Sequence, residues 1–107
     1  MTRVVVTTPV DEDTDEIARY LAKEAGPATA LRYLDMLEAL YERLADYPES
    51  GAPRPNLGRN ARIGIVSPFV VIYDFLPVMD TVMVLRIVHG SRRITRKLLR
   101  PHGRKER

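Results

Sequence analysis

The spacing of apolar residues changes near the middle of this 107-residue chain. Between residues 8 and 47, apolar side chains recur every three or four positions, which is typical of amphipathic helices. Between residues 61 and 89 they form short runs rich in β-branched residues and separated by turn residues, which is typical of strands. Helices followed by strands favour an α+β fold, with the helices packed on one face of an antiparallel sheet.

Two helices are predicted in the first half, after a short strand over residues 3–7. Thr8-Pro9 begins the first helix, because threonine can cap a helix and proline suits the first helical position. Gly26 is a good terminator, and Pro27 begins a second helix that ends at Tyr47-Pro48. Because so little separates them, the two helices should form an antiparallel hairpin.

A loop over residues 49–60, rich in proline and glycine, leads into the strands. The order β-α-α-β-β-β leaves one face of the sheet without a helix, unless the C-terminal segment folds over it. We expect a partner or substrate on that open face. The elements predicted after the loop are strands over residues 61–66, 69–75 and 81–89 and a short helix over residues 91–99.

Charge is divided unevenly along the chain. Residues 1–50 hold 5 Lys+Arg and 11 Asp+Glu, a balance of −6, whereas residues 51–107 hold 12 and 3, a balance of +9, which together give +3. The basic half favours an anionic partner, whether nucleic acid, a nucleic-acid enzyme or an acidic protein segment; the alternative is a solvated basic tail. The aromatic residues lie inside apolar patterns and are not free to stack on bases, which weakens the case for direct nucleic-acid binding but leaves it open.

Several classes of protein do not fit the sequence. Cysteine is absent, so there is no disulfide framework, and a cytoplasmic location is the natural expectation. No apolar run approaches the roughly 20 residues needed to cross a bilayer, and no secretory signal or membrane partner is expected. The two histidines are far apart and the glycine-rich nucleotide-binding motifs are missing, so neither a metal nor a cofactor is predicted. We expect one domain over residues 1–100 and a disordered basic tail over residues 101–107.

Arg86 is the most informative polar residue, because it interrupts the otherwise apolar run Val82–Val88. An unpaired buried guanidinium is costly, so Arg86 should reach an anion, a cluster of carbonyls or the open face. If neighbouring strands pair, Arg62 would share that face, and two arginines would form an anion site. The structural alternative is an ion pair of Arg86 with Asp74 or Asp80, or a bond to a backbone carbonyl.

His89, at the end of the last strand, is a candidate general acid or base, although a hydrogen bond to the backbone at the strand end is the favoured explanation. The alternation of the strand points it away from Arg86. The remaining candidates for contact with an anionic partner are cationic residues of the loop and of the C-terminal segment: Arg54, Arg59, Arg92, Arg93, Arg96 and Lys97.

An ordered set of short motifs resembles the RelE/ParE toxin superfamily of type II toxin–antitoxin systems, on its ParE side. The motifs are Thr8-Pro9 before the first helix, Val70-Val71-Ile72-Tyr73, and Leu85-Arg86-Ile87-Val88-His89-Gly90-Ser91-Arg92. The resemblance extends over about residues 2 to 95. It implies the same α+β fold and a cytoplasmic toxin of the kind that takes part in plasmid stabilization. It also implies a cognate antitoxin, with which the toxin forms a hetero-oligomer and whose flexible acidic segment would suit the basic half.

Two activities are implied by the superfamily. RelE-like members cleave messenger RNA on the ribosome, and here they would rely on Arg62, Arg86 and His89. ParE-like members bind and inhibit DNA gyrase, and for them no catalytic residues are expected. Lysine is absent between Lys23 and Lys97, and tyrosine is absent after Tyr73, which departs from the RelE-like pattern. We therefore predict a ParE-like gyrase inhibitor, with two alternatives: a ribosome-dependent endoribonuclease, or a degenerate, non-toxic module that only binds an antitoxin.

Overall fold

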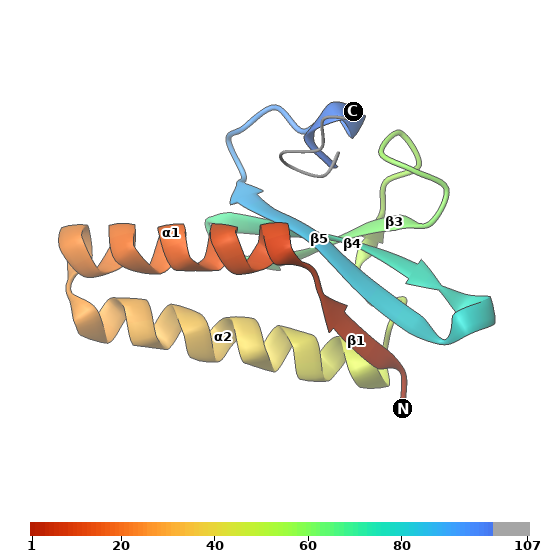
Figure 1. Ribbon diagram of the computed structural model, residues 1–107, viewed down its shortest axis with the longest axis horizontal. Helices are drawn as coiled ribbons and strands as arrows, with labels where there is room; N and C mark the ends of the chain where they lie inside the picture. Colours follow the sequence, from red (N-terminus) through yellow and green to blue (C-terminus); the bar gives the residue numbers. More distant parts are fainter. Residues whose placement is uncertain (100–107) are drawn as a thin grey trace.

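The computed structural model describes residues 1–99, so the prediction of a disordered tail over residues 101–107 lies outside the described residues. A helical hairpin packs on one side of a twisted sheet (Figure 1). The loop over residues 49–60 and residues 91–99, which we call the C-terminal segment, lie on the other side (Figure 1). The elements are β1 (Arg3–Val6), α1 (Thr8–Ala25), α2 (Pro27–Asp46), β2 (Ala52–Pro53), β3 (Ala61–Val66), β4 (Phe69–Leu76), the 3₁₀ helix η1 (Pro77–Met79), β5 (Thr81–His89) and the 3₁₀ helix η2 (Arg96–Leu99).

The helical hairpin forms where it was predicted. Gly26 joins α1 to α2 at a φ of 96°, in the left-handed region that favours glycine. The expected cap is shifted by one residue, because α1 begins at Thr8 and Thr7 precedes it as the N-cap. The hydroxyl of Thr7 does not cap the helix; it donates to the carbonyl of Val84 at 2.7 Å and thereby ties the start of α1 to β5.

The described strands form one sheet in the order β1-β5-β4-β3-β2. The antiparallel meander of β3, β4 and β5 is as predicted, and β5 is interior, as its apolar sequence indicated. Two features differ from the prediction. β1 pairs with β5 in parallel, so the sheet is mixed rather than wholly antiparallel. The proline-rich loop also contains a two-residue strand, β2, which pairs with Arg62 and Ile63 of β3.

A β-bulge in β5 changes which residues share a face. Ile72 pairs with Arg86, but the next residue, Tyr73, pairs with Val84, so Leu85 is an extra residue in its strand. Before the bulge, Val84 faces the helices; after it, Arg86 faces the other way. Strict alternation would place these two residues on the same side of the strand, and the bulge is the physical reason that they are not.

Two apolar clusters lie on the two faces of the sheet. The larger lies under the helices and includes Leu37, Leu40, Val71, Tyr73 and Val84. The smaller lies on the opposite face and contains the following residues: Leu57, Ala61, Val70, Ile72 and Val88, with Ile63, Ile94, Leu98 and Leu99 packed against them. The face that no helix covers is therefore covered by the loop and by the C-terminal segment, as the sequence had allowed.

Candidate functional site

Arg86 does not lie on an open surface. It is 7% exposed, and its guanidinium forms an ion pair with Asp13 of α1: Nε lies 2.8 Å from Oδ2, and one terminal nitrogen lies 3.1 Å from Oδ1. The other terminal nitrogen donates to the carbonyl of Leu98 at 3.1 Å. The expectation that Arg86 forms part of an open anion site is wrong, because α1 and the C-terminal segment use all of these donors internally.

Asp13 has a second partner in β5. β1 stops opposite Val84, so the outer edge of β5 has no strand beside it at Ile87. The amide of Ile87 donates to Oδ2 of Asp13 at 2.9 Å. This hydrogen bond replaces the one that a neighbouring strand would otherwise provide. Asp13 therefore joins α1 to both the backbone and a side chain of β5. The sequence prediction had not singled out Asp13, because an acidic residue in the first turns of a helix is ordinarily explained by capping.

Arg62 and Arg86 lie on opposite faces of the sheet, which corrects the prediction of a shared anion site. Arg62 pairs with Tyr73, whose side chain belongs to the cluster under the helices. One terminal nitrogen of Arg62 donates to the carbonyls of Glu49 and Gly51, at 2.9 and 2.7 Å. Arg62 therefore holds the loop that follows α2 against β3.

Tyr73 holds the same loop from inside the core. Its fully buried hydroxyl donates to the carbonyl of Pro48 and accepts from the amide of Gly51, both at 2.9 Å. Burial raises the pKa of Tyr73, with the hydrogen bond from Gly51 acting in the opposite direction. A Cβ on Gly51 would overlap this hydroxyl and the carbonyl of Ile63, so the close approach of the loop requires glycine here.

His89 is exposed at the end of β5 and faces the helix side. Its ring meets the ring of Phe69 edge-on, with centroids 5.6 Å apart, and its Nδ1 accepts from the amide of Ser91 at 3.0 Å. As predicted, His89 points away from Arg86. The three residues that a RelE-like ribonuclease would use, Arg62, Arg86 and His89, are therefore not brought together.

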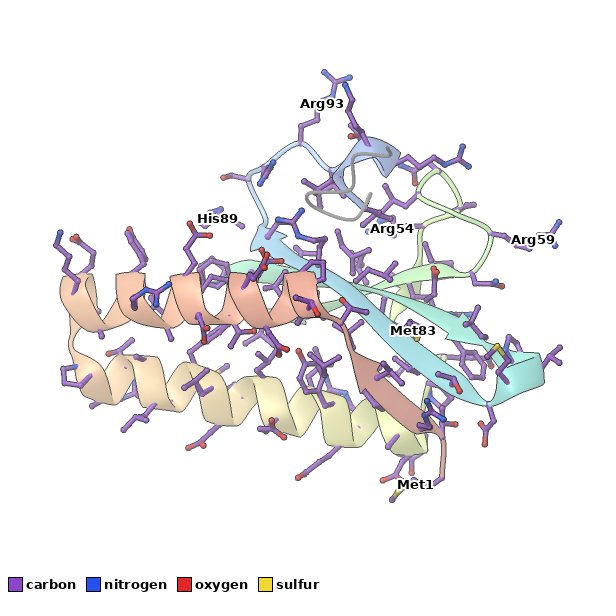
Figure 2. All side chains as sticks on the ribbon, viewed as in Figure 1. Met1, Arg54, Arg59, Met83, His89 and Arg93 are labelled. Atoms are coloured by element: carbon purple, nitrogen blue, oxygen red, sulfur yellow. The ribbon has the colours of Figure 1, made fainter. Side chains whose placement is uncertain are left out.

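The other predicted contact residues are all exposed, and the segments that carry them lie on the side of the sheet opposite the helices (Figure 1); Arg54, at the β2 edge, also lines a cavity with Leu40 and Arg43 of α2. Figure 2 shows Arg54, Arg59 and Arg93 on this side, with Arg54 and Arg59 on the loop and Arg93 just after β5. Arg54 donates to the neighbouring carbonyl of Pro53 at 2.9 Å. We call the six exposed cations of this side the basic surface: Arg54, Arg59, Arg92, Arg93, Arg96 and Lys97.

A cavity of about 140 Å³ opens on the helix side, where the hairpin meets the β3–β4 turn. Leu21, Tyr33, Met36 and Phe69 line it, so its walls are mostly apolar. Apolar side chains are exposed on the same elements: Leu31 is 63% exposed and Met36 is 47% exposed. Apolar surface of this kind is typical of protein–protein contacts.

Over residues 1–99, no helix is long and apolar enough to cross a bilayer. Within the same residues, no three or more His, Asp or Glu side chains are grouped so that they could hold a metal ion.

Comparison with known proteins decides the family. Residues 4–94 match the family described as the ParE toxin of the type II toxin–antitoxin system parDE. The chain belongs to the ParE toxin family. It is thus a toxin of the type II toxin–antitoxin class, and the predicted RelE/ParE superfamily and its ParE side are confirmed.

Individual ParE relatives agree with this assignment. Toxin ParE3 of Caulobacter vibrioides is 31% identical over 98 residues, which cover 92% of this chain and 96% of the relative. A solved chain of the chromosomal ParDE system from P. aeruginosa has a TM-score of 0.69 at 22% identity, covering 83% of this chain and 96% of that one. A chain of the toxin–antitoxin complex RelBE2 from Mycobacterium tuberculosis has a TM-score of 0.59, also at 22% identity, covering 82% and 96%. The two structures show that the fold is shared.

Two surfaces of this ParE family member therefore remain as candidate sites. The basic surface lies on one side of the sheet, and the apolar cavity and its exposed neighbours lie on the helix side. The arginine predicted as the centre of a site, Arg86, is a structural residue.

Proposed function

We propose that this ParE family member inhibits DNA gyrase by binding to it, and that a cognate antitoxin neutralises it in a hetero-oligomer. The observation that carries the proposal is the match of residues 4–94 to the ParE family. A cytoplasmic location follows from this role, since the proposed target acts on chromosomal and plasmid DNA.

The placement of the catalytic candidates supports action by binding rather than by catalysis. Cleavage of an RNA backbone needs an acid–base group and cations that converge on one phosphate. Here Arg62 donates to loop carbonyls, and Arg86 is paired with Asp13 and with the carbonyl of Leu98. His89 lies on the face of the sheet opposite to Arg86. No two of these residues share a site.

The apolar surface of the helix side supports an antitoxin partner. The two solved neighbours come from a ParDE toxin–antitoxin system and from a RelBE2 toxin–antitoxin complex. Exposed Met36 lines the cavity together with Tyr33 and Phe69, and these side chains offer this chain an apolar surface that an amphipathic segment would bury.

Supercoiling by purified gyrase, run beside messenger cleavage on ribosomes, tests the target. We expect loss of supercoiling with accumulation of broken DNA, and intact messenger. His89→Ala should inhibit gyrase as well as the unchanged protein does, because the proposal gives this residue no catalytic role. Messenger cleavage that is lost in His89→Ala, with normal supercoiling, would establish the ribonuclease instead.

Growth without an antitoxin separates a toxin from a degenerate module. We expect expression of this chain alone to arrest growth, and co-expression with the product of an adjacent antitoxin reading frame to restore it. Met36→Glu should weaken the rescue, since it places a charge in the apolar surface, whereas Glu38→Gln on the same helix should not. Normal growth in every case would support the non-toxic alternative.

A further inference from the structure

The basic surface is built from two segments that are distant in sequence. The loop carries Arg54 and Arg59, and residues 91–99 carry the other four cations. Both segments are anchored in the smaller apolar cluster: Leu57, 4% exposed, comes from the loop, and Ile94 and Leu98 come from the C-terminal segment. This cluster therefore holds the two cationic segments together on the side of the sheet away from the helices (Figure 2).

Ionic and hydrogen bonds fix the same arrangement. Arg86 donates to the carbonyl of Leu98, which lies next to Lys97 in η2. On the loop, the amide of Arg54 donates to the carbonyl of Ala61 at the start of β3. The cations thus project from backbone that is already ordered, so little backbone entropy is lost when a ligand binds.

Asp74 of β4 lies on this face of the sheet, paired with Ala61, but it is half-buried, and the stretches that carry the cations contain no acidic residue. Residues 50–73 and 81–99 contain no Asp or Glu, while α1 and α2 carry most of the acidic residues of the chain. Within the described residues, the structure records a single ion pair, and it involves Arg86 rather than the basic surface. The positive field on this side is therefore neutralised only in part, by half-buried Asp74, and will attract an extended anion.

The composition of the basic surface favours a phosphate backbone over an acidic protein segment. Protein interfaces usually have apolar anchors at their centre. Among the described residues, Ile65 of β3 is an exposed apolar side chain on this face of the sheet, but it lies on the strand and not between the cations; Leu31 and Met36 are on α2. The cations are instead accompanied by polar side chains such as Asn56, Ser91 and Thr95. DNA phosphates are contacted by arginine guanidinium groups, which can donate two parallel hydrogen bonds, and by neighbouring hydroxyl and amide donors.

Because aromatic residues are few on this surface, a duplex is favoured over a single strand as its ligand. Single strands are bound largely by stacking bases on aromatic side chains. No Phe, Tyr or Trp occurs in residues 51–68 or after Phe75. Contacts to the phosphates of a duplex need no stacking, because its bases stay paired and the charges supply the affinity.

From this arrangement we infer that the basic surface binds the phosphate backbone of duplex DNA directly and without base specificity. The inference deepens the proposed function and rests on it for its setting: the duplex in question is the one on which gyrase acts. The toxin would then hold enzyme and DNA together, contacting the DNA through the basic surface and leaving the helix side for proteins.

Binding to a 30-base-pair duplex without gyrase, followed by fluorescence anisotropy between 50 and 200 mM salt, tests the inference. Six phosphate contacts predict that affinity falls about 10³-fold over this range, with a slope of log K against log salt of about −5. Arg92→Ala with Arg93→Ala should bring the slope to about −3.6 and the loss to about 10²-fold. Arg19→Ala with Arg32→Ala is the matched control: it removes the same charge from exposed positions of α1 and α2 and should leave the slope unchanged.

Three results would overturn the inference. The first is absence of duplex binding at 50 mM salt. The second is an equal effect of the two double variants, which would indicate attraction by net charge alone. The third is tighter binding of a single strand, or of a polyglutamate peptide of matched charge, than of the duplex. The supercoiling assay is independent: duplex binding without gyrase inhibition would refute the proposed function and leave this inference standing.

Discussion

Asp13 and Arg86 form a buried ion pair between the first helix and the interior strand β5, with Nε of Arg86 2.8 Å from Oδ2 of Asp13. The two side chains are 11% and 9% exposed, respectively. Because the same carboxylate accepts from the amide of Ile87, and the same guanidinium donates to the carbonyl of Leu98, the pair connects α1, β5 and the C-terminal segment. The pair therefore links the helices on one face of the sheet to the C-terminal segment on the other face.

Asp13→Asn should be strongly destabilising. It would leave the guanidinium of Arg86 buried without a counter-charge, and removing one partner of a buried ion pair costs about 3–5 kcal/mol. Urea denaturation measures the loss in the free energy of unfolding. Asp15→Asn, which removes the same charge from an exposed position on α1, should change it by no more than about 0.5 kcal/mol. Similar losses in the two variants would contradict the assigned role of Asp13.

Replacing both partners should cost less than replacing one. Asp13→Leu with Arg86→Met removes both charges and fills the space with apolar atoms, which is often close to neutral for a buried pair. Recovery should be incomplete, however, because the amide of Ile87 would lose its acceptor, at a cost of about 1–3 kcal/mol. The expected order of unfolding midpoints in urea is therefore the unchanged protein, then the double variant, then Asp13→Asn. A double variant less stable than Asp13→Asn would refute this account.

Removing a tyrosine hydroxyl should have opposite effects at Tyr73, which is fully buried, and at Tyr41, which is half-buried. Tyr73→Phe removes the bridge between Pro48 and Gly51 and should cost about 1–3 kcal/mol, because two loop groups lose their partner. Tyr41→Phe should be neutral or stabilising, because its hydroxyl is buried and has no hydrogen-bond partner among residues 1–99. Urea denaturation measures the change in the free energy of unfolding for both variants. Hydrogen exchange should also accelerate at the amide of Gly51 in Tyr73→Phe alone, and faster exchange in both variants would contradict the assignment.

Much of this fold was predictable because local rules and the tertiary structure agree. The bounds of β3 and β5 follow from β-branched runs ended by turn residues, and the helical hairpin follows from a glycine and a proline at one junction. The parallel pairing of β1 with β5 was not predictable in the same way. It joins residues about 78 positions apart in the register Arg3 with Thr81, and no local pattern carries that information.

The candidate site was predicted less well, and the bulge at Leu85 is the main reason. Alternation assigns Val84 and Arg86 to one face, and a single extra residue separates them. The sequence did identify Arg86 as a residue that needs a partner, and it named Asp74, Asp80 or a backbone carbonyl; the bond to the carbonyl of Leu98 agrees with the last of these. The acidic partner, Asp13, comes from a helix, and only the three-dimensional packing of α1 on β5 brings it within reach. The exposure of the six cations of the basic surface could be predicted from their charge, but their common side depends on the packing of the loop and the C-terminal segment against strand residues such as Val70 and Val88.

Asp74 should make stability depend on pH in the opposite direction to an ordinary ion-paired carboxylate. Partial burial raises the pKa of Asp74 above its usual value of 3.8, because desolvation disfavours the charged form. The folded state then binds the proton more tightly than the unfolded state does. The contribution of the neutral carboxyl is complete below pH 3.8 and is lost as the pH rises through the raised value.

Asp74→Asn keeps the polar group and removes the charge, so it isolates this effect. We expect the variant to unfold at a higher urea concentration than the unchanged protein at pH 7, and the difference to vanish as the pH falls below 3.8. Comparing the two proteins at each pH cancels the titration of every other carboxyl. Asp35→Asn, at an exposed position of α2, serves as the control and should show no such trend. A difference between Asp74→Asn and the unchanged protein that grows as the pH falls would mean that the carboxylate of Asp74 is stabilised in the folded protein, and that burial is not what sets its pKa.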